Sequence, residues 1–270
     1  MAVCTAENLK VLFDHLIEGE ELLTVLKEGF KHLLFLRRQL PLPYLLLERE
    51  QTLDNGFLNG PNNTGRSQGN GGKCGHRPVG LRSAKARKRD TAITNIKSNL
   101  NALDCLESTK RIFALAIVFG STIISPREVF LLRPKFGKSD EDVNTKVDGK
   151  NDVSHAKRID RTARSLIRNL VTNPQLSSLC EMKPTNVFMF VLATRSQESS
   201  LHDGFLPKQG YKLPHKGKHY DIILTNEDSY DSNEADFSTE LLNLQQEMDL
   251  IWYQAKKVLR GFSETKSAFF

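Results

Sequence analysis

An apolar helix pattern that ends in the sequence RRQLPLPY constrains the fold of this chain more than any other feature. The apolar residues recur at three- and four-residue steps and therefore share one helix face: Leu22, Leu23, Leu26, Phe30, Leu33 and Leu34. Arg37 and Arg38 follow in the last turn, where cations complement the helix dipole. Pro41 lacks an N–H and, like Pro43, disfavours helical geometry in the preceding residue. The pattern predicts a long amphipathic helix that packs on a core and then stops abruptly.

The composition is that of a globular protein with no membrane span or secretory leader. The chain has 270 residues, 39% of them apolar, which is enough for one large domain or two small ones. No apolar run approaches the roughly 18 residues of a membrane helix, and the N-terminal region lacks a basic-then-apolar signal pattern. The four cysteines are far apart and form no CxxC pair, so we expect reduced intracellular thiols.

Charge is unevenly distributed along the chain, whose net charge is +6. Residues 66–111 carry 11 Lys or Arg against three acids, whereas residues 219–255 carry nine acids and no Lys or Arg. This asymmetry gives weak support to nucleic-acid binding. The basic run KARKR at residues 85–89 suits a nuclear-import signal, a patch for acidic groups or a solvated linker.

The hydrophobic periodicity predicts a single α+β domain that spans residues 1–270. Three main helices are expected, at residues 7–39, 91–110 and 159–170. Strands are expected at residues 112–119, 129–132, 185–194 and 219–225. This order predicts helices on one face of a mostly antiparallel sheet.

Polar tracts separate these elements. Residues 51–90 are expected to form a flexible basic insertion, because residues 51–80 hold eight of the 17 glycines and five asparagines and cannot bury enough apolar surface. Residues 137–155 and 226–240 are expected to be polar loops, and residues 205–208 a further loop.

No catalytic or cofactor motif is found in the sequence. The GxGxxG, P-loop, HExxH and GxSxG patterns do not occur, and no Cys or His spacing suits zinc. His215 and His219 are four residues apart, but Gly217 and the strand context argue against a metal pair. The sequence therefore predicts a binding protein with no cofactor, no metal and no catalytic residues.

Four segments together resemble the comet family, adaptors that bind the spindle-checkpoint protein MAD-two. They are RRQLPLPY with its preceding helix, a buried strand followed by SPREVF, then FLPKQGYKLPHKGK, and IWYQAKKVLRGF. They occur in the family's order and cover roughly a third of the chain. The resemblance implies a HORMA-like fold in which the C-terminal segment, here residues 249–262, folds back as a β-strand belt with Trp252 as its anchor.

The resemblance also implies a function. The family binds the closed form of MAD-two and presents it to a hexameric AAA+ ATPase that remodels HORMA proteins, which silences the spindle checkpoint. The adaptor itself hydrolyses nothing. The expected locations are the nucleus and cytoplasm, and the spindle or kinetochore in mitosis. No membrane or nucleic-acid partner is expected.

The family's MAD-two-facing surface combines the helix before QLPLPY with the third long helix. On this surface the resemblance places Phe35, Leu36, Gln39, Arg164 and Ile167. Arg37 is expected to be an exposed neighbour. Leu36 stands where the family has a glutamine and Ile167 where it has an aromatic residue, so a more aliphatic interface or a matching change in the partner is implied. Ile167 equally suits plain core packing.

Pro207 and Lys208 match the pair with which the family engages the ATPase, and they also suit an ordinary loop. An alternative function is that of another HORMA-type protein that embraces a peptide in meiosis or DNA repair. The short chain after Trp252 argues for the adaptor over this alternative. A third, weaker alternative is a nucleic-acid-associated factor that uses residues 85–89, whose binding would weaken steeply with salt.

Overall fold

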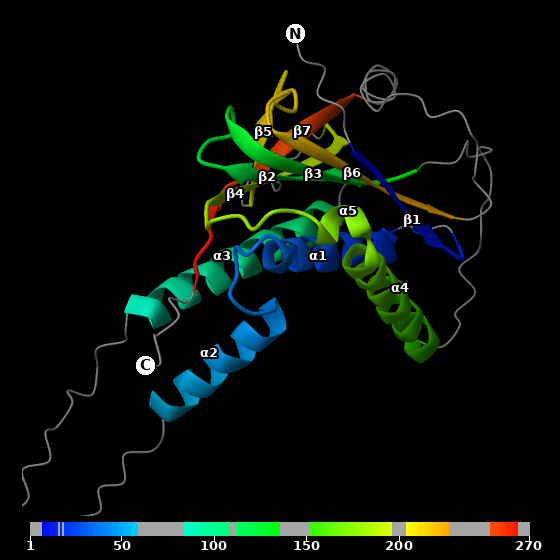
Figure 1. The fold of residues 1–270 in the computed structure, drawn as a ribbon. Coiled ribbons are helices and arrows are strands. Elements are labelled where there is room, and N and C mark those ends of the chain that lie inside the picture. The colour runs from blue at the N-terminus through cyan, green and yellow to red at the C-terminus, as the bar shows by residue number, and fades with distance from the viewer. Residues whose placement is uncertain are drawn as a thin grey trace, which may run out of the picture.

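An eight-stranded sheet organises the chain in the computed structural model, which describes residues 7–15, 17, 19–58, 84–107, 112–135, 152–195, 204–226 and 249–263. The strands are β1 (Glu7–Phe13), β2 (Ile112–Gly120), β3 (Pro126–Pro134), β4 (Asn186–Thr194), β5 (Phe205–Lys208), β6 (Lys218–Asn226), β7 (Leu250–Ala255) and β8 (Leu259–Arg260). The helices are α1 (Gly19–Leu36), α2 (Tyr44–Leu58), α3 (Ala84–Glu107), α4 (Asp152–Thr172) and the short α5 (Pro174–Ser177). These elements confirm the α+β class (Figure 1).

The sheet is mostly antiparallel and runs in the order β1-β6-β3-β2-β4-β7-β5, with β8 added to β4. Within the described residues only two strand pairs are parallel, β1 with β6 and β3 with β6. The central strands β2 and β4 are apolar along their length because both of their faces are buried. In the described residues β1 and β5 form the two edges of the sheet, which places residues 7–13 far from residues 205–208.

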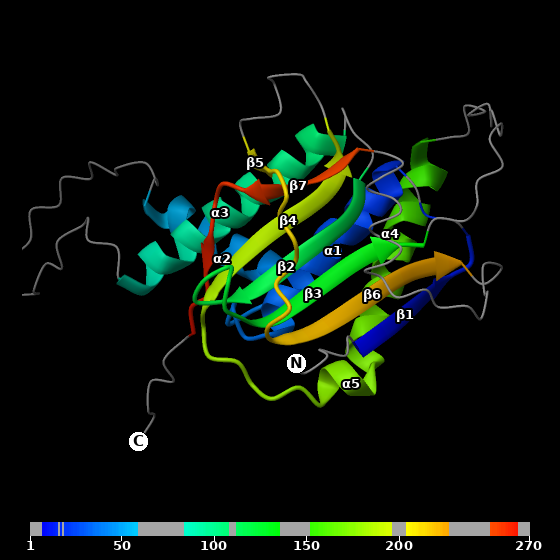
Figure 2. The same ribbon diagram turned by 90° about the horizontal axis from the view of Figure 1, so that it is seen from above.

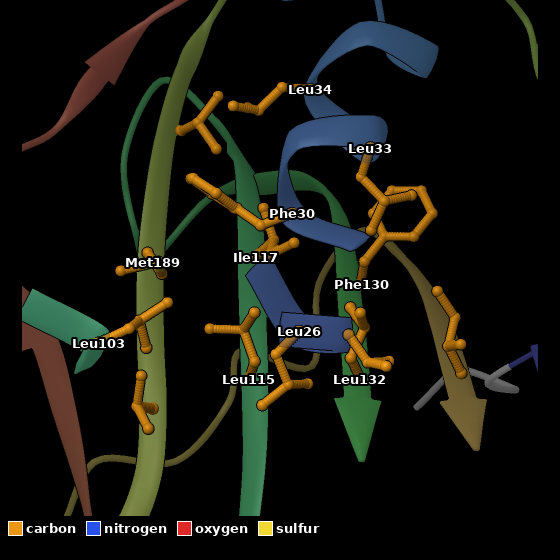
Figure 3. Packing of buried hydrophobic residues seen from close by; sticks show 14 of the residues in the cluster. Leu26, Phe30, Leu33, Leu34, Leu103, Leu115, Ile117, Phe130, Leu132 and Met189 are labelled. Atoms are coloured by element: carbon orange, nitrogen blue, oxygen red, sulfur yellow. The ribbon is translucent and has the colours of Figure 1, made fainter. Parts of the chain in front are cut away.

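α1, α3 and α4 lie on one face of the sheet, and α2 packs against α1 and α3 (Figure 1). Seen from above, α1 crosses the middle of the sheet, with α3 on one side and α4 on the other (Figure 2). Leu26 and Phe30 of α1 point down onto Leu115, Ile117 and other strand residues (Figure 3), and both α1 residues are fully buried. Burial of each such side chain contributes about 1.5–3 kcal/mol, so this layer supplies much of the driving force for folding.

The opposite face of the sheet has a second, smaller apolar cluster. Its centre is Phe190 of β4, on which the ring of Tyr211 stacks at a centroid distance of 4.5 Å. Trp252 of β7 lies edge-on to the same tyrosine, at 6.3 Å. The residues that follow β5 therefore cover this face and bury the C-terminal strand.

Two predictions of secondary structure are wrong at the N-terminal side. Residues 7–13, predicted to begin a helix, form the strand β1, whose alternating burial of Leu9, Val11 and Phe13 is a strand pattern. The described residues also form four helices of 15 residues or more rather than three, because α2 was not predicted.

The predicted insertion at residues 51–90 has helical ends. Its first eight residues belong to α2 and its last seven to α3. Arg89 of α3 pairs with Asp54 and, at 3.7 Å, with Glu50 of α2, which holds the two helices together. Residues 59–83 lie outside the described part of the chain, as do most of the predicted loops at 137–155 and 226–240; the first loop ends in α4.

Candidate partner-binding site

A groove of about 370 Å³ lies between α1 and α4 on the side away from the sheet. Its α1 wall consists of Glu20, Thr24 and Glu28, which share a face because they are four residues apart. Its α4 wall consists of Ala156, Ile159, Asp160, Ala163, Arg164 and Ile167. The groove has an apolar floor and charged margins, which is the arrangement that a protein partner's side chain requires.

Two of the residues predicted from the resemblance lie in this groove. Ile167 is half-buried and lines it, so this side chain is not wholly part of the core. Arg164 is exposed and pairs with Asp160 one turn earlier. Close approach of the helices is possible because α1 has Gly29, where a Cβ would lie 2.6 Å from Leu132 and 3.2 Å from Leu166.

A buried carboxylate fixes α4 against α1 next to the groove. Glu21 accepts hydrogen bonds from the hydroxyl of Thr162 and from His15 Nε2, the latter at 2.8 Å. Arg158 lies 3.6 Å from the same carboxylate. Partial burial disfavours the charged imidazole, but the hydrogen bonds to Glu21 and Asp14 outweigh it and raise the pKa of His15. The Glu21 carboxylate thus connects α1 to α4 and to the segment that follows β1.

The C-terminal end of α1 forms a Schellman motif. Arg38 has a φ of 56°, and its N–H donates to the Phe35 carbonyl at 3.0 Å, while the Gln39 N–H donates to Leu34 at 2.9 Å. Phe35 and Leu36 are half-buried in the last turn, and Leu36 packs partly against the core. These two residues do not line the groove, so the predicted surface has two separate parts.

The prediction that Arg37 is exposed is wrong, and Gln39, assigned to the MAD-two-facing surface by resemblance, is also buried. Gln39 is 1% exposed; its Nε2 donates to the Arg37 carbonyl at 2.7 Å, and its Oε1 accepts from the Thr185 N–H at 2.8 Å. Arg37 makes a bidentate ion pair with Glu128, both contacts at 2.7 Å. The helix ends before Pro41 as expected, but Arg37 and Gln39 turn inward, where they pair with the Glu128 carboxylate and with backbone groups. The RRQLPLPY segment is therefore an internal junction.

Pro207 and Lys208 lie on β5, an edge strand, rather than in a loop. Pro207 is exposed and pairs in register with Tyr253, and Lys208 pairs with Trp252. Proline has no N–H, but it is tolerated on an edge strand because no further strand needs a hydrogen bond from that position. The pair is thus held in a fixed backbone conformation at one margin of the sheet.

The C-terminal segment is built into the sheet. β7 lies between β4 and β5 and pairs with both, so neither of its edges is free. Trp252 is 1% exposed, although its Nε1 has no hydrogen-bond partner among the described residues. The Phe262 N–H donates to the Gln39 carbonyl at 3.0 Å, which ties the end of this segment to the RRQLPLPY junction.

The described residues hold no group of three His, Cys, Asp or Glu that could bind a metal ion. Among the described helices none is long and apolar enough to cross a membrane.

A sequence model of the p31comet family, described as Mad1 and Cdc20-bound-Mad2 binding, matches residues 2–264. The chain belongs to the p31comet family. The match spans nearly all of the 270 residues, so both predicted surfaces and the C-terminal segment lie within it. No curated protein is significantly similar in sequence to this p31comet chain.

The acidic wall of the groove in this p31comet protein was not predicted. Glu20, Thr24 and Glu28 stand at i, i+4 and i+8, on the flank of the apolar stripe of α1. That spacing could have indicated a polar face beside the core face. It could not have indicated which helix would lie alongside it.

Proposed function

We propose that this p31comet protein is a non-enzymatic adaptor that binds Mad2, the MAD-two of the sequence comparison above, in its closed conformation and delivers it to a HORMA-remodelling AAA+ ATPase. The observation that carries the proposal is the groove between α1 and α4, which contains Arg164 and Ile167. Both were assigned to the Mad2-facing surface by resemblance alone. In the structure they line one groove, which is large enough to accept side chains of a partner.

The fold that we propose is HORMA-like. Its support is the C-terminal segment, which returns to the sheet as β7 and β8 and buries Trp252. Because β7 is paired on both edges, its backbone offers no ladder position to a peptide. This arrangement favours the adaptor over a protein that embraces a peptide in meiosis or DNA repair.

Two partners have room to bind at once. α4 packs near β1, at one edge of the sheet, whereas Pro207 and Lys208 lie on β5 at the other edge (Figure 2). With about 4.8 Å between neighbouring strands, the edges are on the order of 25–30 Å apart. Mad2 at the groove and the ATPase at β5 would therefore not compete for the same surface.

In this proposal the chain supplies binding energy and geometry, and the ATPase supplies the work of reopening Mad2. The result is silencing of the spindle assembly checkpoint. The proposed sites of action are the nucleus and cytoplasm, and the spindle or kinetochore in mitosis.

Conversion of closed to open Mad2 by the ATPase and ATP tests the adaptor role. We expect the variant P207A/K208A to bind Mad2 normally and to lose stimulation of this conversion. The matched control P214A/K216A changes the same residue types in the segment after β5 and should stay active. Full activity of P207A/K208A would show that β5 is not the ATPase contact.

A further inference from the structure

A stripe of four cations runs along the solvent face of α4. Lys157, Arg161, Arg164 and Arg168 stand at i, i+4, i+7 and i+11, and all four are exposed. They lie opposite the residues that α4 buries, which include Leu166. With a rise of 1.5 Å per residue the stripe is about 16 Å long. In Figure 1, α4 projects at one end of the helix layer.

The stripe is electrostatically unfavourable in the free protein. Lys157 and Arg161 are one turn apart, as are Arg164 and Arg168, and like charges at this spacing destabilise a helix. Asp160 pairs with Arg164. No ion pair within the described residues holds the other three. Asp160 and, more weakly, Asp14 offset part of this charge. The excess of cations on this face still suits an acidic ligand.

The chemistry of the surroundings favours a protein ligand over a nucleic acid. The α4 face has no aromatic residue on which a base could stack. Glu20 and Glu28 line the other side of the groove and would repel a long polyanion. A short acidic segment of a folded protein can cover the stripe and avoid both glutamates.

We propose that the α4 stripe is an electrostatic docking surface for an acidic segment of the partner that occupies the α1/α4 groove. The inference rests on the proposed function, because Arg164 belongs to both the stripe and the groove wall and makes them one continuous surface. The partner's acidic side lies over α4, and its basic or neutral side lies over Glu20 and Glu28 of α1. This charge pattern fixes the orientation of the partner and accelerates its association.

Association kinetics with Mad2 loaded with a Cdc20 peptide test the inference. The rate constants for the full chain are measured between 50 and 500 mM NaCl, roughly the range over which the Debye length falls from about 13 to 4 Å. The test variant is K157E/R168E, which changes no groove residue and creates attractive i,i+4 pairs with Arg161 and Arg164. Its folding should therefore be intact, which the thermal midpoint checks. The control R49E/R87E makes the same charge change on exposed residues of α2 and α3.

At 50 mM NaCl we expect the association rate of K157E/R168E to be about tenfold below that of the wild type, with the two converging at 500 mM and the dissociation rate changed less than twofold. R49E/R87E should retain at least half of the wild-type rate. Equal, salt-insensitive rates for wild type and K157E/R168E would overturn this inference and leave the proposed function standing. No binding by the wild type at any salt concentration would overturn both.

A 20-base-pair DNA duplex and vesicles with 30% phosphatidylserine serve as competing probes. We expect neither to bind the wild type measurably at 150 mM NaCl. Binding of either probe that K157E/R168E abolishes, together with unchanged Mad2 kinetics in that variant, would assign the stripe to a nucleic acid or a membrane and overturn the inference.

Discussion

The Gln39 side chain accepts a hydrogen bond from the Thr185 N–H at 2.8 Å and so joins the end of α1 to the segment that enters β4. The same side chain donates to the Arg37 carbonyl at 2.7 Å. Gly261 approaches it so closely that an added Cβ would lie 2.2 Å from Oε1. One buried amide thus joins the end of α1 to a segment 146 residues away, and a third segment, at Gly261, packs closely against it.

Replacement of Gln39 by leucine should destabilise the protein rather than weaken partner binding directly. It leaves the Thr185 N–H unpaired, and a buried polar group without a partner costs about 1–3 kcal/mol. Urea unfolding measures the loss, with the exposed Gln175→Leu as control. A change of less than about 0.5 kcal/mol would show that the junction does not depend on this amide.

Arg38→Gly should stabilise the protein. Arg38 has a φ of 56°, and a left-handed conformation costs a non-glycine residue about 1–2 kcal/mol. The greater freedom of glycine in the unfolded chain offsets part of this gain, so we expect a net increase of about 0.5–1 kcal/mol. The lost ion pair with Glu181 joins two mostly exposed side chains and contributes little. Arg38→Ala is the control: it removes the same ion pair but keeps a non-glycine residue in the left-handed conformation. Its unfolding free energy should not exceed that of the wild type.

Ile167→Glu should weaken Mad2 binding without unfolding the chain. A charged group in the apolar floor of the groove removes an interface anchor worth about 2 kcal/mol, which corresponds to about a thirtyfold loss of affinity. Ile124→Glu is the matched control, because Ile124 is 80% exposed in the turn after β2. Circular dichroism of both variants separates the two roles of Ile167: an unfolded Ile167→Glu would place this residue in the core.

The helix layer and the central strands were predictable because their signals are local. The apolar stripe of α1 and the uninterrupted apolar run of β2 each specify both an element and its burial. β1 was missed because its seven alternating residues precede a strong helix pattern and were interpreted as the first turns of that helix. α2 was missed because it exposes Leu45 and Leu53 and shows little helical periodicity.

The candidate site was predictable only in part, for a physical reason. Ile167 and Arg164 could be placed on one helix face from their spacing, but the groove exists because α1 lies alongside. Gln39 was placed on the Mad2-facing surface by resemblance, and Arg37 was expected to be its exposed neighbour. Their partners, Glu128 and Thr185, are 91 and 146 residues away, and no local pattern reveals such contacts.

The stability contributed by His15 should fall as the pH rises. Its pKa is raised in the folded protein, so its bonds to Glu21 and Asp14 contribute fully below the ordinary value of 6.5 and are lost as the pH passes the raised value. Burial lowers the pKa of His32 and His219, which therefore act in the opposite direction. His32 and His219 are present in both the wild type and His15→Gln, so their contributions cancel in the difference between the unfolding free energies of the two proteins. We expect this difference to shrink steadily above pH 6.5; a pH-independent difference would contradict the ion-pair role of His15.

The most direct test of the central claim is size-exclusion chromatography of the full chain with Mad2 in each of its two conformations. With Mad2 loaded with a Cdc20 peptide, we predict a one-to-one complex that elutes ahead of both components and that Ile167→Glu disrupts. With Mad2 held in the open conformation, we predict two separate peaks. Equal binding to the two conformations, or a complex that Ile167→Glu leaves unchanged, would contradict recognition of closed Mad2 at the α1/α4 groove.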